Sequence, residues 1–281
     1  MAELGVENVA APNTEVSHEA TLFAEPLMQV GQFSITNSLV TSWLAIIIIV
    51  VVCLVIAKKV KPVPGKAQGA AELVVESGLN LADSVTGNRA KTVKIFPIAL
   101  AIFLFVLINN WLGLIPGVGS IGFIEGEVGH QVFVPWLRGG TADLNTTLAL
   151  ALFSVIGANI FGIIMVGLWK HFNKFVNLKA FAAIPGHIIK DPTIVIVNPI
   201  KAFVGIIEII GEVAKVASLS FRLFGNIFAG EVLLSSIAVI FAFLLPIPFM
   251  FLEIIVGIIQ ALIFAMLTLV YFTIASTAEE H

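Results

Sequence analysis

The stretch SLSFRLFGN, residues 218–226, carries one arginine inside an apolar region that runs from Ile194 to Leu245. The guanidinium of Arg222 cannot lose its proton, so it stays cationic even in hydrocarbon. On insertion scales, an arginine at the centre of a membrane helix costs about 2.5–3.5 kcal/mol. A charge held at that cost predicts a functional site with an anionic or water-filled surrounding. The same C-terminal third holds four glutamates, which together with the fixed cation indicate an ion path: Glu208, Glu212, Glu231 and Glu253.

The composition predicts an all-α integral membrane protein. Hydrophobic residues make up 58% of the 281 residues and charged residues only 12%, with a mean hydropathy of +1.04. The single cysteine, Cys53, permits neither a disulfide within the chain nor a redox motif. The sequence has no GxxxxGK[ST] loop and no HExxH spacing, so we expect no cofactor, no metal, no nucleic-acid partner and no nucleotide hydrolysis by this chain alone.

Hydropathy divides the chain into about five membrane helices and one surface helix, since a span needs roughly 20 apolar residues. The expected spans are 39–57, 95–115, 146–168, 195–243 and 249–276. Residues 68–88 mix acidic and aliphatic side chains at the spacing of an amphipathic helix on the membrane surface. We therefore expect residues 1–37 to form an N-terminal segment and residues 38–281 to form a single membrane domain.

The region 195–243 is too long for an ordinary span. A continuous helix of this length would extend roughly 70 Å at 1.5 Å per residue, whereas the hydrocarbon core is about 30 Å thick. The helix is therefore either broken near Gly225 or Gly230 or steeply inclined, and we favour steep inclination. A turn at 244–248 would join it to the last helix in an antiparallel hairpin of strongly tilted helices.

The basic residues predict the orientation in the membrane. Seven lie between Lys58 and Lys94 and four between Lys170 and Lys190, whereas none precedes Lys58 and the 116–143 loop has only Arg138. The basic loops are therefore expected in the cytoplasm. The N-terminus would face outside, and the C-terminal residues 279–281 would be cytoplasmic.

Polar side chains follow one face of the 195–243 helix. At about 100° per residue, a narrow arc includes Lys201, Glu208, Glu212, Lys215, Arg222 and Asn226. For Lys201 and Lys215 the competing interpretation is a solvated helix end, because lysines near helix ends reach the interface. For Glu208 this interpretation and a functional one weigh equally.

Glu231 lies nine positions after Arg222, about 180° round the helix, so the two cannot bridge directly. We expect Glu231 to face the last helix, where Glu253 and Gln260 share a face. Two carboxylates in one buried site cannot both be ionised cheaply, which suits the passage of a proton. The alternatives are an interhelical hydrogen bond for the carboxylates and for Gln260. For Asp143 the alternative is a helix N-cap.

These residues carry a resemblance to a known family. The segment RLFGNIFAGE (222–231), followed by QALIF (260–264) and TLVY (268–271), resembles subunit a of the bacterial rotary ATP synthase. The similarity extends upstream to NNWLGLIP (109–116), ADLNTTL (142–148) and ITNS (35–38). It covers the chain from about residue 35 to the C-terminus, and nothing useful matches before Phe33.

The resemblance implies an ion-conducting stator that is not itself catalytic, beside a rotating ring of c subunits. The arginine that matches Arg222 would separate two offset half-channels and keep the passing ring carboxylate ionised. The implied outer half-channel comprises Asn226, Glu231, Glu253 and Gln260, with Asp143 and Asn145 near its mouth. Glu208 and Ser218 would line the cytoplasmic half-channel. Many members have one carboxylate and one histidine at the positions of Glu231 and Glu253, whereas this chain has glutamate at both, which leaves open which one relays the proton.

The resemblance also implies partners and a location. The partners would be the c ring, peripheral-stalk b subunits, the remaining synthase subunits, membrane lipid and the transported H⁺, in a bacterial plasma membrane. Three alternatives stay open from the sequence: a Na⁺-translocating version of this subunit, a stand-alone secondary transporter, and a membrane anchor without an ion path. Buried charges argue against the anchor, and the lack of an internal repeat argues against the transporter.

Overall fold

In the computed structural model, the described residues are 21–58, 60–125, 132–169, 194–241 and 244–277. Within these ranges, five helices are long and apolar enough to cross a membrane. Their bounds are Asn37–Lys58, Arg89–Leu114, Leu144–Val166, Phe203–Ile240 and Pro246–Ala275. The expected class, an all-α membrane protein with five membrane helices, is confirmed.

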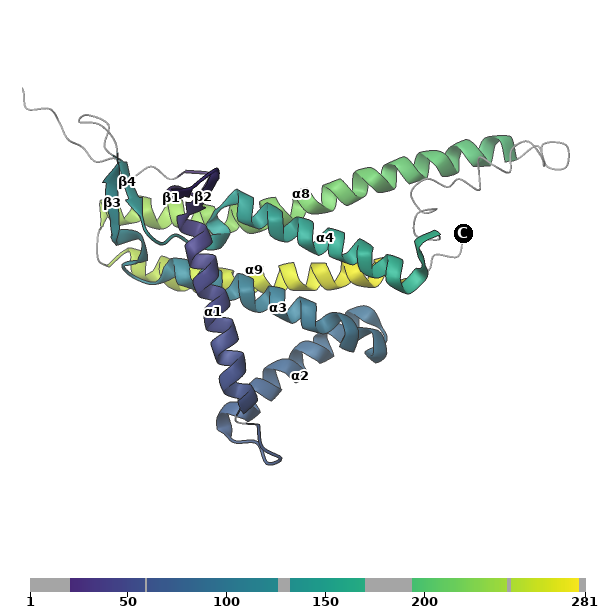
Figure 1. Ribbon diagram of the computed structural model, residues 1–281, viewed down its shortest axis with the longest axis horizontal. Helices are drawn as coiled ribbons and strands as arrows, with labels where there is room; N and C mark the ends of the chain where they lie inside the picture. Colours follow the sequence, from purple (N-terminus) through teal and green to yellow (C-terminus); the bar gives the residue numbers. More distant parts are fainter. Residues whose placement is uncertain (1–20, 59, 126–131, 170–193, 242–243, 278–281) are drawn as a thin grey trace, which may run out of the picture.

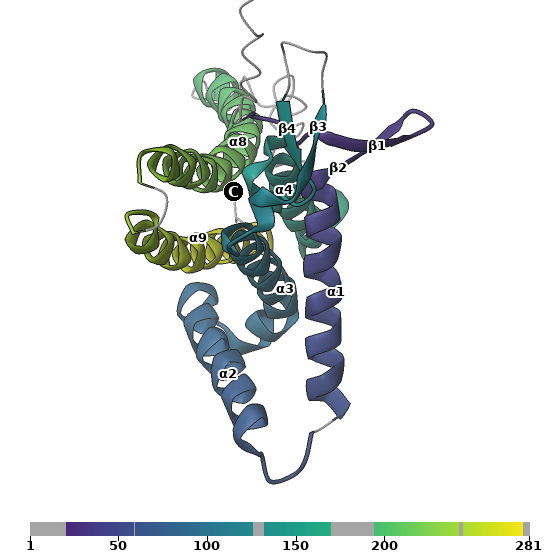
Figure 2. The ribbon, with the colours of Figure 1, turned by 90° about the vertical axis from the view of Figure 1, so that its left-hand side faces the viewer.

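Four long helices form the body of the molecule and a fifth crosses them. The body consists of α3 (Arg89–Leu114), α4 (Leu144–Val166), α8 (Ile194–Ile240) and α9 (Pro246–Ala275), which pack side by side. Helix α1 (Asn37–Lys58) stands steeply against them, and α2 (Lys66–Thr86) leads from the foot of α1 back to α3 (Figures 1 and 2). The body helices therefore incline strongly when α1 is upright.

Lengths agree with that arrangement. The 22 residues of α1 extend about 33 Å, which matches the hydrocarbon core when the helix is upright. Helix α8 has 47 residues and extends about 70 Å. It continues as one α-helix through Gly225 and Gly230, so the mismatch with the bilayer is met by inclination and not by a break.

The core lies where the four body helices meet. Each contributes two fully or nearly buried side chains to one cluster: Ile102, Val106, Ala151, Val155, Leu219, Leu223, Ala261 and Phe264. A second cluster joins α2 to the body, with Ala82 packed among Phe96 of α3 and Phe272 of α9. Many other aliphatic side chains are exposed, as lipid-facing surfaces require.

Helices α3 and α9 begin earlier than hydropathy indicates by the largest margins. Helix α3 starts at Arg89, because Asn88 caps it by accepting hydrogen bonds from the backbone N–H groups of Ala90 and Lys91. The charged first turns of α3 mask this start in a hydropathy pattern. Helix α9 starts at Pro246, so its prolines occupy the first turn, where a missing N–H costs nothing, and do not form the turn itself.

Short strands and 3₁₀ turns gather at the end of the molecule where α8 ends and α9 begins (Figure 1). The first hairpin pairs β1 (Pro26–Val30) with β2 (Phe33–Thr36), turning at Gly31 with φ 67°. The second pairs β3 (Gly122–Glu125) with β4 (Val132–Pro135). The 3₁₀ turns are η1 (Val118–Ser120) and η2 (Gly140–Ala142). Strands this short leave little hydropathy signal, so the sequence did not predict these segments.

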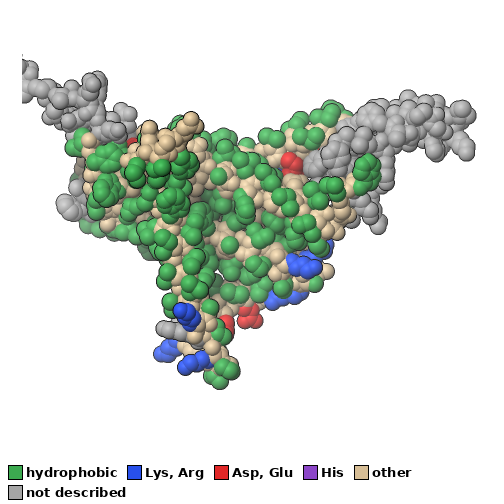
Figure 3. Space-filling model, viewed as in Figure 1, with side chains coloured by type: hydrophobic (Ala, Val, Ile, Leu, Met, Phe, Trp, Pro, Cys, Tyr) green, Lys and Arg blue, Asp and Glu red, His purple; other side chains and the backbone are tan. Residues whose placement is uncertain are grey.

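Charge is unevenly distributed over the described surface. Lysine and arginine side chains gather at the foot of α1 and at the corner between α2 and α3 (Figure 3). The opposite end, with both hairpins, has Arg138 as its basic residue within the described ranges. Residues 1–20, the basic stretch from 170 to 190 and the C-terminal residues 279–281, on which the expected orientation also depends, lie outside the described residues.

Candidate functional site

Arg222 lies on an exposed face of α8. Its Nη2 donates a long hydrogen bond of 3.4 Å to the Ser218 hydroxyl one turn earlier. No carboxylate pairs with it within the described ranges of the chain. The guanidinium is therefore a cation on a membrane-facing helix without an anionic partner in this part of the chain.

One turn further along α8, Asn226 reaches across to α9. Its Nδ2 donates to Oε1 of Gln260 over 2.8 Å. Gln260 is only 3% exposed, and among the described groups its Nε2 has no hydrogen-bond partner. The pair thus joins the two long helices and leaves one buried donor free for water or for an incoming acceptor.

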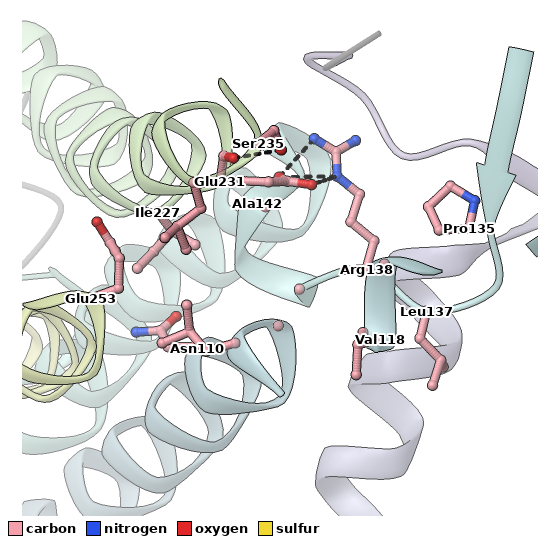
Figure 4. Close-up of a pocket in the computed structure, with 15 residues that line it drawn as sticks. Asn110, Val118, Pro135, Leu137, Arg138, Ala142, Ile227, Glu231, Ser235 and Glu253 are labelled. Atoms are coloured by element: carbon pink, nitrogen blue, oxygen red, sulfur yellow. Dashed lines mark hydrogen bonds and ion pairs between the residues drawn. The ribbon is translucent and has the colours of Figure 1, made fainter. Parts of the chain in front are cut away.

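Glu231 contacts a residue that the sequence analysis did not place in the site. Nε of Arg138 donates to both carboxylate oxygens of Glu231, over 3.0 and 3.2 Å, and Nη2 donates to Oε2 over 3.1 Å. Arg138 follows β4 and is 93 positions away in sequence. Both residues line a cavity of about 180 Å³ between α3, α8, α9 and the loops around η1 and η2 (Figure 4).

Glu253 of α9 lines the same cavity and is 7% exposed. The Glu253 side chain lies against the backbone of α8 at Gly230. A Cβ built on Gly230 would lie only 2.3 Å from Cδ of Glu253. Among the described residues, no hydrogen bond or ion pair joins the Glu253 carboxyl to another group. In Figure 4 Glu231 extends toward Arg138, whereas the Glu253 carboxyl points away from that pair. The two glutamates therefore share a cavity but occupy different surroundings.

Asp143 is the N-cap of α4 and also a tether. Its carboxylate accepts from the backbone N–H groups of Asn145 and Thr146, from the Ser38 hydroxyl and from the backbone N–H of Ala24. The Asn145 side chain is exposed, and neither residue lines the cavity. The structure thus places Asp143 in a hydrogen-bonded junction beside the cavity and Asn145 on the outer surface of that junction.

On the other side of Arg222, α8 carries a second polar group. Oε1 of Glu212 accepts from Nζ of Lys215 over 2.6 Å, and its Oε2 accepts from Nδ2 of Asn159 on α4 over 3.1 Å. The Lys215 ammonium also lies 5.4 Å from the centre of the Tyr271 ring. Glu208 is half-buried one turn further toward the start of α8.

The expected residues therefore fall into two groups separated by Arg222. One group lies toward the end of the molecule that carries the β-hairpins: Glu231, Glu253 and the Asn226–Gln260 pair. Glu208 lies on the other side of Arg222, toward the start of α8. From Glu208 to Glu231 the helix rises about 35 Å along its own axis, and because α8 is inclined these groups differ less in membrane depth. Polar groups on both sides of an unpaired cation can carry protons part of the way from each surface while the cation blocks direct passage.

Arg138 extends this set beyond the residues assigned from the sequence, and Glu212 extends it beyond those assigned to a half-channel. Glu212 already stands in the polar arc of α8, so its spacing indicated it. Arg138 had one signal, as the single basic residue of its loop. That signal did not identify its partner, since the contact with Glu231 depends on the fold.

The chain is similar to known proteins over most of its length. The family model for the ATP synthase A chain matches residues 39–273. ATP synthase subunit a of Syntrophobacter fumaroxidans is 32% identical over 252 residues, which cover 89% of this chain and 87% of that protein. Subunit a of Geobacter sulfurreducens is 32% identical, covering 87% and 89%. Subunit a of Mycobacterium marinum is 31% identical over 281 residues, covering 98% of both chains.

Proposed function

Because the chain belongs to the ATP synthase subunit a family, we propose that it is the proton-translocating stator of a rotary ATP synthase, with Arg222 between two offset half-channels. Family membership makes it an ion-translocating component of the membrane sector and not a catalytic subunit. The proton as the transported ion, the essential arginine and the half-channels are the proposal.

The observation that carries the proposal is the unpaired, exposed position of Arg222 on α8. An arginine in this environment needs an anion, and no carboxylate within the described ranges supplies one. A ring of c subunits, each with a carboxylate at membrane depth, would bring that anion past Arg222 repeatedly. The nearby cation keeps each passing carboxylate ionised, so the ring cannot carry its proton straight across.

Two sets of polar residues would form the half-channels. The outer half-channel comprises Asn226, Glu231, Glu253 and Gln260, with the Asp143–Asn145 junction at its mouth. The cytoplasmic half-channel comprises Glu208 and Ser218. Glu212, with its partners Lys215 and Asn159, extends it. Contacts between α8 and α9 support this division, because the Asn226–Gln260 hydrogen bond and the Glu253–Gly230 packing keep the outer group together.

The remaining parts of the proposal concern surroundings. The chain would contact the c ring through the Arg222 face of α8 and the peripheral-stalk b subunits elsewhere. It would lie in a bacterial plasma membrane with the N-terminus outside and the C-terminus in the cytoplasm. Exposed Lys58, Lys61 and Lys66 at the foot of α1 support that orientation, because basic residues favour the cytoplasmic side.

Arg222→Ala tests the proposal in the assembled complex. We expect ATP-driven proton pumping by inverted membrane vesicles to be abolished, while ATP hydrolysis by the detached catalytic head is unchanged. Lys61→Ala is the control, because Lys61 is an exposed cation in the loop between α1 and α2, outside the proposed path, and this variant should pump normally. Wild-type pumping by Arg222→Ala would overturn the proposal.

A further inference from the structure

Arg138 has an unusually complete set of contacts for a loop residue. It is 5% exposed, and its Nε and Nη2 bind the Glu231 carboxylate. Its Nη1 donates to the Thr21 hydroxyl over 3.1 Å and to the Phe23 carbonyl over 3.2 Å, and Nη2 donates to the Thr21 carbonyl over 2.8 Å. The guanidinium is thus fixed in one geometry by α8 and by the segment that precedes β1.

Burial of this arginine requires its partner to remain. A guanidinium cannot lose its proton, and removing one member of a buried ion pair leaves an uncompensated charge at a large energetic cost. The contact between Nε and both oxygens of Glu231 meets that need with a charge-assisted hydrogen bond. Glu231 therefore serves Arg138 as a counter-ion.

Glu253 differs in each of these respects. It lines the same cavity from α9, where the other charged or titratable lining residues are Arg138 and Glu231, which are paired with each other. Its carboxyl points away from the Arg138–Glu231 pair (Figure 4). Gly230 leaves room for that carboxyl against α8. On α9, Gln260 lies seven positions later on the same helix face and holds Asn226, which leads from Glu253 toward Arg222.

Resting on the proposed function, we infer that Arg138 is a positioning residue that holds Glu231 as a fixed anion in the wall of the outer half-channel, and that Glu253 alone takes up and releases the transported proton there. Glu253 gains a proton that arrives from the outer side as hydronium, which is left as water, and later yields that proton to the ionised ring carboxylate beyond the Asn226–Gln260 pair. The O–H bond is the bond that forms and breaks, and Glu231 keeps its charge throughout.

The experiment measures passive proton flux through reconstituted membrane sectors stripped of the catalytic head, over a pH series, normalised to the amount of complex. Glu253→Gln should lower the flux by about 100-fold, in the range for loss of a proton-transfer group. Glu231→Gln should reduce the yield of assembled complex, because it leaves the buried Arg138 charge without its partner. Arg138→Gln should reduce the yield less, because the Glu231 carboxylate that it leaves unpaired is 36% exposed.

The decisive variant is Arg138→Gln combined with Glu231→Gln. Both charges then leave together, and glutamine retains hydrogen-bonding groups at each position. We expect the double variant to assemble better than either single variant and to conduct with the wild-type pH profile, which a relay through Glu231 does not allow. Arg138→Lys should fall between wild type and Arg138→Gln, because lysine keeps the charge but lacks the planar fork.

Three results would overturn the inference: wild-type flux in Glu253→Gln, a double variant that loses flux as Glu253→Gln does, or a double variant that fails to assemble. Arg222→Ala separates these from failure of the proposed function. If Arg222→Ala blocks pumping while the double variant fails, the roles of Arg138 and Glu253 are wrong and the proposed function stands. If Arg222→Ala pumps normally, the proposed function itself fails.

Discussion

Gly230 shows how a single position on α8 controls the outer cavity. The Glu253 carboxyl occupies the space that a side chain at this position would need, with both oxygens 2.4 Å from a built Cβ. Helical glycine costs about 1 kcal/mol relative to alanine, so the sequence accepts a weaker helix here. The gain is close contact between Glu253 and the α8 backbone.

Gly230→Ala is therefore expected to displace the Glu253 carboxyl by about 1 Å and to lower passive proton flux by roughly 100-fold, the loss typical of such misplacement. Flux per assembled complex in reconstituted vesicles measures the effect. Gly69→Ala is the matched control, because a Cβ on Gly69 of α2 meets nothing within 4 Å. Normal flux in Gly230→Ala would show that Glu253 does not act from this position.

At this scale the sequence predicted which residues share a helix face better than which residues are in contact, since Glu231 was expected to meet Glu253 and instead binds Arg138. Helical spacing gave the face of Arg222, its separation from Glu231 and the shared face of Glu253 and Gln260. It could not give the partner of Glu231, because Arg138 approaches from a loop whose path follows no periodic pattern. Spacing within one helix fixes directions, whereas pairing between distant segments depends on the assembled fold.

Among the elements, α8 presents small side chains on the face that carries Arg222. Ser218, Gly225 and Ala229 are exposed and lie within about 60° of Arg222 around the helix. Small residues let another helix approach closely in a membrane. This face therefore suits the proposed contact with the c ring.

Ala229→Cys, in a chain whose native Cys53 is replaced by serine, is expected to form oxidative cross-links with cysteines placed at membrane depth in the c subunit. Val213→Cys is the control, because Val213 is 67% exposed but lies about 180° from Arg222 on the same helix. Gel mobility of the cross-linked product gives the measurement. Equal cross-linking at both positions, or none at Ala229, would contradict the proposed ring-facing surface.

The corner between α2 and α3 carries an ion pair, Asp83 with Arg89, whose carboxylate lies in α2 outside the membrane spans. The pKa of Asp83 lies below its usual value of 3.8, chiefly because of the Thr92 hydroxyl, while burial opposes the lowering and the Arg89 guanidinium adds to it. Because the carboxyl has a lower pKa in the folded protein than in the unfolded chain, its ionised form stabilises the folded corner at pH values above the unfolded pKa. This stabilisation is lost as the pH falls through the folded-state pKa.

Hydrogen exchange in residues 83–92 is therefore expected to increase as pH falls below 3.8, after correction for the intrinsic exchange rate. Asp83→Asn should show the faster exchange already at neutral pH and little further change on acidification. Mass spectrometry of the solubilised complex measures both. Identical pH profiles for the two proteins would mean that the Asp83 carboxylate does not hold the corner.

For the molecule as a whole, hydropathy was sufficient to predict the number of membrane helices and the inclination of the last two. The inclination could be inferred because α8 is longer than the bilayer is thick. The length of the apolar stretch in the sequence is enough to reveal this mismatch. The hairpins and the outer junction were not predicted. They depend on buried polar contacts between distant segments, such as the hydrogen bond that Nδ2 of Asn37 donates to the Pro135 carbonyl over 3.2 Å.

Orientation is the property of the whole molecule that its charge asymmetry predicts. Ile121, between η1 and β3, is 68% exposed at the hairpin end, and Val63, between α1 and α2, is 82% exposed beside the basic cluster. In intact cells that carry the protein without its native Cys53, a membrane-impermeant thiol reagent should label Ile121→Cys. The hairpin end has too few basic residues to be retained in the cytoplasm, so we expect it to face outside. Val63→Cys should react only in inverted vesicles. Labelling of Val63→Cys from outside the cell would show that the chain has the opposite orientation. The cavity lined by Arg138, Glu231 and Glu253 would then open to the cytoplasm.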